Sequence, residues 1–148
     1  MKPTDEEGFM AEIVRVTLDN NPEALGTFEV DGVVVLVEPK SQQDWSNESL
    51  RCLDWTLNHQ LRRALEKMGE LPVFVPSMNK IKAPYVVLCS AMSGKKSLEQ
   101  NCQTLALKSL AIISEKGQLP SEWCEWTCQG LTSIYLCEVR DQEQGERN

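Results

Sequence analysis

The residues of this chain that could do chemistry are concentrated in one short run, Ser93-Gly94-Lys95-Lys96-Ser97, which joins an apolar segment to a helical pattern. Free N–H groups and the helix dipole favour anions at a helix N-terminus, and two lysines add positive charge here. The run is therefore either a solvated turn or a weak anion or phosphate site. A Walker phosphate loop would need a glycine five residues before Gly94, but that position holds Cys89, so nucleotide hydrolysis is not supported. The candidate anion-binding residues are Ser93, Gly94, Lys95, Lys96 and Ser97.

The remaining reactive side chains point to no catalytic or metal site. His59 is the single histidine, within a helical pattern, and we expect a surface or half-buried position for it. Cys124 and Cys128 are four residues apart, but a zinc site normally has four nitrogen or sulfur ligands and no second short-spaced pair exists. We therefore predict no catalytic residue, no metal and no cofactor. The neighbouring Trp123 and Trp126 are expected to anchor packing or to form an aromatic patch for a partner.

Composition bounds the class of protein. The 148 residues are 41% hydrophobic and 25% charged, which is ordinary for a soluble globular domain. A net charge of -7 argues against nucleic-acid binding, because phosphate neutralisation needs clustered Lys and Arg. No stretch predicts a secretory signal or a membrane span, so we expect a cytoplasmic protein whose six cysteines are mostly small buried hydrophobes. One domain is predicted over residues 9–140, with flexible polar tails at 1–8 and 141–148.

The sequence patterns around the lysine-rich run predict an α/β domain. Alternating or continuous apolar residues predict strands at 12–18, 33–37, 73–75, 85–89 and 133–139, with a further β element near 27–30. Apolar residues at helical spacing predict one long helix over 47–68. A second long helix is predicted from Ser97, which would open it in a Ser-x-x-Gln capping box, to Lys116, where Gly117 and then Pro120 would end it. Residues 122–129 are ambiguous between helix and loop.

From Asp31 onward the chain resembles the N-terminal domain of the cytosol (leucyl) aminopeptidase family. The resemblance rests on the strand Asp31-Gly32-Val33-Val34-Val35-Leu36, on a helix ending near Gly69, and on Ile81-Lys82-Ala83-Pro84-Tyr85-Val86-Val87-Leu88. It covers about 110 residues by pattern rather than by a signature motif. The fold it implies is macro-like and three-layered: α/β, with a mixed, largely parallel sheet that has helices on both faces.

The resemblance does not bring peptidase activity with it. In that family the two-metal site lies in a C-terminal domain with an Asn-Thr-Asp-Ala-Glu-Gly-Arg motif, which this sequence lacks. We therefore expect a non-catalytic module that acts by pairing with a protein partner, by self-association or by binding a small anion. The alternative is a small macro-like enzyme or binder acting on a phosphate-containing nucleotide metabolite. Against it, the glycine-rich phosphate loop and Asn-Ala-Ala-Asn-like segment of ADP-ribose-binding macro domains are both missing.

Overall fold

The computed structural model of the chain describes residues 11–18, 21, 23–37, 48–66, 72–91, 95–128 and 130–139. The polar tails predicted at the two ends lie outside the described residues, as do Ser93 and Gly94 of the lysine-rich run.

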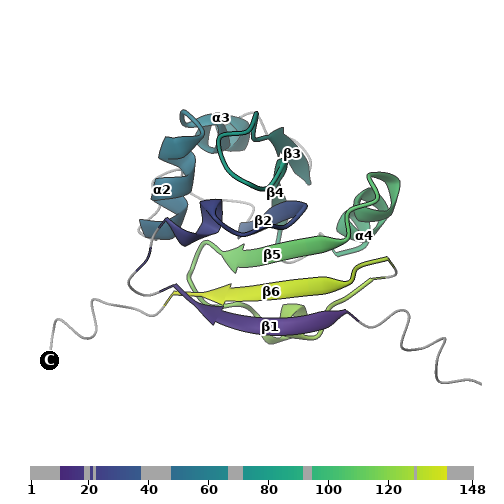
Figure 1. Ribbon diagram of the computed structural model, residues 1–148. Helices are drawn as coiled ribbons and strands as arrows, with labels where there is room; N and C mark the ends of the chain where they lie inside the picture. Colours follow the sequence, from purple (N-terminus) through teal and green to yellow (C-terminus); the bar gives the residue numbers. More distant parts are fainter. Residues whose placement is uncertain are drawn as a thin grey trace, which may run out of the picture.

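The described residues form a six-stranded sheet in the order β1-β6-β5-β2-β4-β3. Every neighbouring pair of strands is parallel except β3 and β4, which are antiparallel (Figure 1). The sheet is thus mixed and largely parallel, as the sequence predicts. The strands are β1 (Glu12–Thr17), β2 (Gly32–Val37), β3 (Val73–Pro76), β4 (Tyr85–Ser90), β5 (Ser109–Ser114) and β6 (Ser133–Glu138).

Helices cover both faces of this sheet. They are the 3-10 turn η1 (Ala24–Gly26), α2 (Glu48–Thr56), α3 (Gln60–Glu66), α4 (Lys95–Thr104) and α5 (Ser121–Cys124). Leu25 of η1, Leu50 of α2 and Leu61 of α3 pack with Val35 of β2 in one buried cluster. Leu98 of α4 and Trp123 of α5 belong to a second cluster, with Leu36 of β2. Because neighbouring residues of a strand point to opposite faces, the two clusters lie on opposite sides of β2. The three-layer prediction is confirmed.

The central strands explain the continuous apolar runs in the sequence. All six residues of β2 are buried, because β2 has β4 on one side, β5 on the other and a helical layer on each face. A parallel strand in this position has no solvent-facing side, so its sequence does not alternate. The apolar runs predicted as β2 and β4 are therefore confirmed as central strands.

The predicted helix from Ser97 to Lys116 is wrong in its second half. The helix α4 begins at Lys95 and ends at Thr104, and residues 109–114 form β5 between β2 and β6. Ala106, with a φ of 58°, lies in the turn between them, where the Leu107 N–H donates to the Cys102 carbonyl at 2.9 Å. The apolar residues of 109–114 point to both faces of a buried strand and do not form a broad stripe on a helix. The capping box at Ser97 fails with it, since the helix starts two residues earlier.

The predicted helix over 47–68 is two helices. The helical conformation is interrupted at Asn58 and His59, whose φ angles of 59° and 62° lie in the left-handed region, so α2 and α3 meet at a corner. The β element expected near 27–30 is also absent among the described residues, where the chain instead forms η1 and an irregular segment. In the ambiguous stretch 122–129, residues up to Cys124 belong to the short helix α5 and residues 125–128 follow it as a turn and loop, while Gln129 lies outside the described residues.

Candidate functional site at the carboxyl ends of the central strands

Three parallel strands end together at one edge of the sheet. In the register of the sheet, Ser90 at the end of β4 lies opposite Val37, and Ser114 at the end of β5 lies opposite Leu36. Both serines are 5% exposed, although most buried residues nearby are apolar. The Ala91 N–H donates to the Val37 carbonyl at 2.9 Å, so the chain leaves the sheet just beyond these residues. Backbone groups of three segments thus come together at this edge.

The connections from β2 and β5 run in opposite directions. After β2 the chain passes through α2 and α3 on one face and continues to β3 and β4, whereas after β5 it passes through α5 on the other face to β6. Since β2 and β5 are neighbours, the point between their carboxyl ends is a topological switch point. Open α/β sheets bind ligands at such points. This edge is therefore the candidate functional site of the fold.

The lysine-rich run enters α4 from this same edge. Lys95 and Lys96 are the first two residues of α4, four residues after Ala91, and Lys96 is exposed. The Lys95 ammonium lies 5.8 Å from the centre of the Trp123 ring, a cation–π distance. Trp123 in turn donates a hydrogen bond from its indole nitrogen to the Ala91 carbonyl, at 2.9 Å. The structure therefore brings one lysine of the run against the segment that follows β4.

Ser97 has a structural role. It occupies the third position of α4, and its carbonyl accepts a hydrogen bond of 2.7 Å from the side-chain amide of Asn101. Of the five candidate anion-binding residues, the structure describes Lys95, Lys96 and Ser97. For the predicted anion site, the structure therefore gives the positions of the two lysines at the start of α4.

The turn after β5 forms the other side of the site. The Ser114 hydroxyl accepts a hydrogen bond from the Lys116 N–H at 3.2 Å, and the Gly117 N–H donates to the Ser114 carbonyl at 2.9 Å. Gly117 has a φ of 90°, and a Cβ added to it would lie 2.8 Å from the Val139 carbonyl oxygen. Only glycine meets both conditions without strain. The turn is thus fixed against the end of β6.

Sequence reasoning missed the contribution of this turn because Lys116-Gly117 ends a helix equally well. A signal was present: Ile112 and Ile113 are β-branched and belong to four consecutive apolar residues that lie between Ser109 and Ser114, a segment with the length of a central strand. The sequence could not have shown that Trp123 belongs to this site, because its indole N–H donates to a carbonyl 32 residues earlier, that of Ala91.

The cysteines form no metal site in the part of the chain that the structure describes, where no group of three or more potential ligands gathers. Cys102 is near Cys128 and Cys89, and a hydrogen bond joins its thiol to that of Cys128. Burial raises the pKa of the Cys89 and Cys137 thiols to about 12, and burial, with a smaller effect of Cys128, does the same for Cys102. Protonated buried thiols are poor nucleophiles and poor ligands. The expectation that the cysteines are mostly small buried hydrophobes fits these four, while Cys52 and Cys124 are half-buried.

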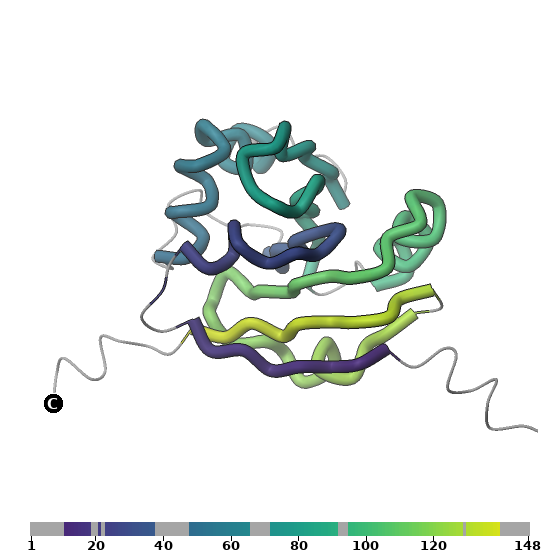
Figure 2. The backbone as a smooth tube through the Cα atoms, viewed as in Figure 1, coloured from purple at the N-terminus to yellow at the C-terminus, as the bar shows by residue number. Residues whose placement is uncertain are grey.

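The single histidine belongs to the corner between α2 and α3. Its Nδ1 lies 3.1 Å from an oxygen of Asp54, a carboxylate that is only 3% exposed, while the His59 side chain itself is 46% exposed. The other Asp54 oxygen accepts a hydrogen bond from the Arg62 N–H at 3.1 Å, at the start of α3. The surface or half-buried position expected for His59 is confirmed, although the residue lies in a turn and not within a helix. The helices α2 and α3 belong to the layer on one face of the sheet, and α4 lies on the other face (Figure 2).

Comparison with known proteins gives a likeness of structure and none of sequence. No family model matches the chain, and no curated protein matches it. Among solved structures, the macrodomain of Thermus aquaticus DarG matches with a TM-score of 0.55. The match covers 87% of this chain and 99% of that one, at 13% sequence identity. The fold is macro-like.

This comparison supports the macro-like fold that the sequence resemblance implies, but not its assignment to the aminopeptidase N-terminal domain. Over the described part of this macro-like chain, no helix is long and apolar enough to cross a membrane.

Proposed function

We propose that the chain binds a phosphate-containing nucleotide metabolite at the carboxyl ends of β2, β4 and β5. The observation that carries the proposal is the position of Lys95 and Lys96, which begin α4 directly after the switch-point edge. The free N–H groups of a ten-residue helix and two ammonium groups would together stabilise a phosphate there. The likeness of the fold to a macrodomain favours a nucleotide-type ligand over a free anion.

The proposal is tested by ligand-induced thermal shift on the full chain. ADP-ribose, ADP and inorganic phosphate are added in turn to the wild type, to the double variant Lys95→Ala/Lys96→Ala, and to Lys108→Ala as a control at an exposed lysine elsewhere. A ligand at one hundred times its Kd stabilises the folded state by about 2.7 kcal/mol, which is a rise of roughly 5–10 °C in Tm for a domain of this size.

We expect ADP-ribose or ADP to raise the Tm of the wild type and of Lys108→Ala, and not that of the double variant. The shift is compared rather than the absolute Tm, because removing Lys95 also removes its contact with Trp123. Equal shifts in all three proteins would exclude the lysines as the site. A wild type that no nucleotide stabilises would exclude the proposal itself.

The second candidate is an interaction or oligomerisation module, supported by a large hydrophobic side chain that remains exposed. The Trp55 side chain is 72% exposed. Light-scattering mass of the wild type, measured from low to high protein concentration, separates the two candidates. A nucleotide binder that stays monomeric would exclude self-association, and a constitutive dimer that ignores nucleotides would favour it.

A further inference from the structure

The indole of Trp55 is not explained by the fold. It is 72% exposed at the end of α2, whereas Trp123 and Trp126 are 0% and 6% exposed. A buried aromatic side chain removes about 150–250 Å² from water and dominates the energetics of cores and interfaces. Trp55 provides almost none of this stabilisation within the chain. Tryptophan is, however, the residue type most enriched among the few that carry the binding energy of protein interfaces, together with tyrosine and arginine.

The surface around Trp55 is held in one conformation by the buried Asp54 carboxylate. This carboxylate contacts His59 at 3.1 Å, accepts the Arg62 N–H at 3.1 Å and lies 3.6 Å from the Arg62 side-chain Nε. The Asn58 N–H donates to the Trp55 carbonyl at 3.0 Å. Because these contacts fix the corner before any partner arrives, docking there would cost little ordering entropy.

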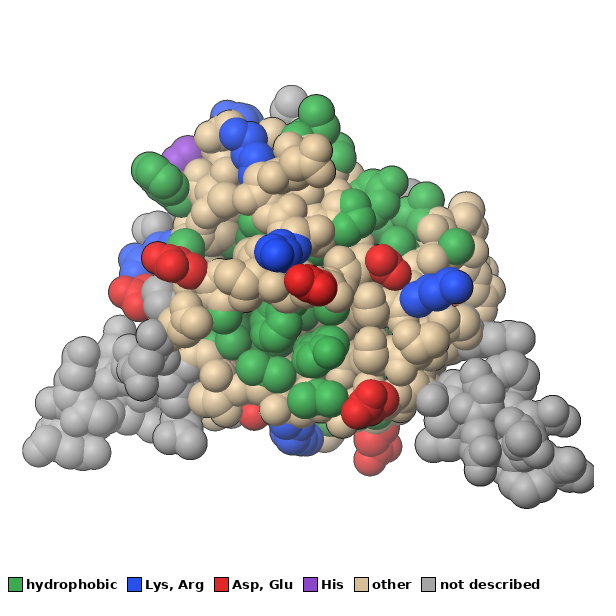
Figure 3. All heavy atoms as spheres, in the orientation of Figure 1, with side chains coloured by type: hydrophobic (Ala, Val, Ile, Leu, Met, Phe, Trp, Pro, Cys, Tyr) green, Lys and Arg blue, Asp and Glu red, His purple; other side chains and the backbone are tan. Residues whose placement is uncertain are grey.

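Arginine side chains gather at the same corner. Arg63 is exposed and donates from Nη2 to the Asn58 carbonyl at 2.8 Å, which places its guanidinium beside the turn that follows Trp55. Arg51 lies one helical turn before Trp55 and is 52% exposed. In Figure 3 the purple histidine lies beside an exposed hydrophobic side chain, in agreement with the spacing of Trp55 and His59.

Two exposed arginines lie near Trp55 although the chain is acidic. Residues 48–66 hold three arginines and three acids, a formal charge of zero, while the whole chain carries -7. Asp54 is 3% exposed and contacts Arg62 inside the corner, so Arg51 and Arg63 are the arginines whose guanidinium groups are left for a partner, and Glu48 is the acid described as facing solvent there. A guanidinium binds a carboxylate through paired hydrogen bonds.

We propose that the corner formed by Arg51, Trp55, His59 and Arg63 is a docking surface for an acidic segment of a partner protein. An apolar side chain of the segment covers the Trp55 indole, and a carboxylate next to it pairs with the Arg63 guanidinium. The surface lies on the α2–α3 layer, so it is separate from the nucleotide site proposed at α4, and either can fail without the other.

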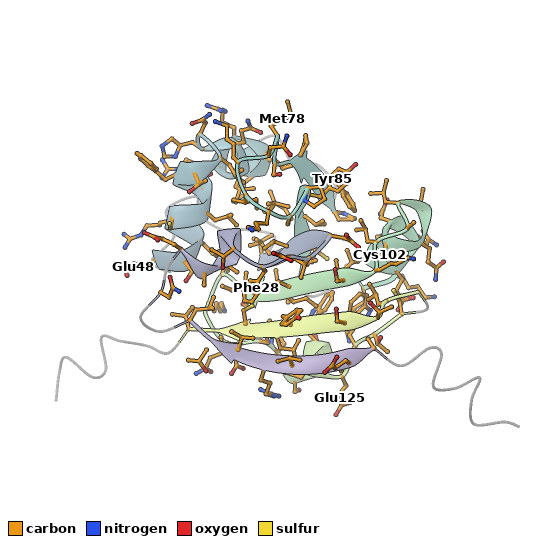
Figure 4. All side chains as sticks on the ribbon, viewed as in Figure 1. Phe28, Glu48, Met78, Tyr85, Cys102 and Glu125 are labelled. Atoms are coloured by element: carbon orange, nitrogen blue, oxygen red, sulfur yellow. The ribbon has the colours of Figure 1, made fainter. Side chains whose placement is uncertain are left out.

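The test is fluorescence anisotropy of a labelled synthetic peptide of glutamate and aspartate residues with one central phenylalanine. A second peptide, with lysine in place of every acid, measures the dependence on charge. The variants are Trp55→Ala and Arg63→Gln. Met78→Ala removes an equally exposed hydrophobic side chain that lies on the β3–β4 loop (Figure 4), outside the α2–α3 corner, and Lys108→Gln removes an exposed positive charge elsewhere.

We expect the acidic peptide to bind the wild type, Met78→Ala and Lys108→Gln alike. Trp55→Ala and Arg63→Gln should each weaken binding at least about tenfold, which is 1.4 kcal/mol. Raised salt should weaken binding, because the arginines are exposed to solvent. The proposal is overturned by a wild type that does not bind the acidic peptide, by equal binding of the lysine peptide, or by controls that lose as much affinity as the two variants. If the wild type is a dimer that Trp55→Ala dissociates, the partner at this corner is a second copy of the chain. If the wild type binds a single-stranded oligonucleotide in preference to the peptide, the partner is a nucleic acid. Either result also overturns the proposal.

Discussion

The indole nitrogen of Trp123 donates a hydrogen bond to the backbone carbonyl of Ala91, 2.9 Å away. This bond joins α5 to the segment that follows β4, at the edge where we propose a ligand to bind. The Trp123 ring is fully buried and also supports the Lys95 ammonium at 5.8 Å. One side chain thus links the three elements that form the candidate site.

Trp123→Phe keeps an aromatic ring and removes this hydrogen bond. The free energy of unfolding should fall by about 1–3 kcal/mol, because the Ala91 carbonyl loses its partner and the smaller ring leaves space in the core. Denaturation by urea measures the change. The nucleotide-induced thermal shift should fall too. Trp126→Phe, whose indole instead donates to Glu99 at 3.2 Å, should leave that shift in place. Loss of the shift in Trp126→Phe alone would contradict this view of the site.

Gly117→Ala should destabilise the protein more than Gly130→Ala. Both glycines have positive φ angles, 90° and 100°, so both substitutions strain the backbone. Only at Gly117 would the new Cβ meet a backbone oxygen, that of Val139 at 2.8 Å, while at Gly130 nothing lies within 4 Å. We expect a loss of about 1 kcal/mol at Gly130 and of about 2 kcal/mol or more at Gly117. Equal losses would mean that the turn moves freely away from the end of β6.

Asp54→Ala should lower the free energy of unfolding by about 1–3 kcal/mol, because it leaves the partly buried Arg62 N–H without its acceptor and removes the contact that holds His59. Glu48→Ala removes a partly exposed ion pair with Arg51 at 3.8 Å, and should change stability by less than about 0.5 kcal/mol. Chemical denaturation of the two variants under one set of conditions gives the comparison. If Asp54→Ala is as mild as Glu48→Ala, the corner is not held by this carboxylate.

Alkaline pH should destabilise the fold through the buried thiols. Burial raises the pKa of Cys89 and Cys137 from 9.0 to about 12 in the folded chain. At a pH between the pKa of the unfolded chain and that of the folded chain, these thiols lose their protons only in the unfolded chain. Their ionisation therefore favours unfolding, and the stability that is present below the unfolded pKa is lost as pH rises. Stability should therefore fall between about pH 9 and pH 12. Urea midpoints across this range test the slope, which should be shallower in a Cys89→Ala/Cys137→Ala variant, and an unchanged slope would contradict the assignment.

Much of the fold follows from short sequence patterns. The continuous apolar runs of β2 and β4 predict central strands that are buried on both faces. These predictions succeed because a strand that is covered on both faces needs apolar residues at every position. The lysine-rich run could likewise be identified as the start of a helix, although the helix begins at Lys95 rather than Ser97.

The run from Ser109 to Ser114 shows where local pattern stops being informative. Its apolar residues suit a helix or a buried strand, and periodicity cannot separate the two over six residues. The choice depends on β2 and β6, which provide hydrogen-bond partners on both sides. Leu110 pairs with Gly32, 78 residues before it, and with Ile134, 24 residues after it. Contacts of this kind exist only in the assembled sheet.

By itself, the sequence determined an α/β domain with central apolar strands, a lysine-rich run at the entry to a helix, and cysteines that are mostly buried. Only the tertiary structure decided that Lys95 lies beside Trp123, that Ser90 and Ser114 end strands flanking β2, and that Trp55 remains exposed. The physical reason is the same in each case. Helix starts and strand cores are set by neighbours along the chain, whereas the site is formed by strand ends that become neighbours only when the sheet closes.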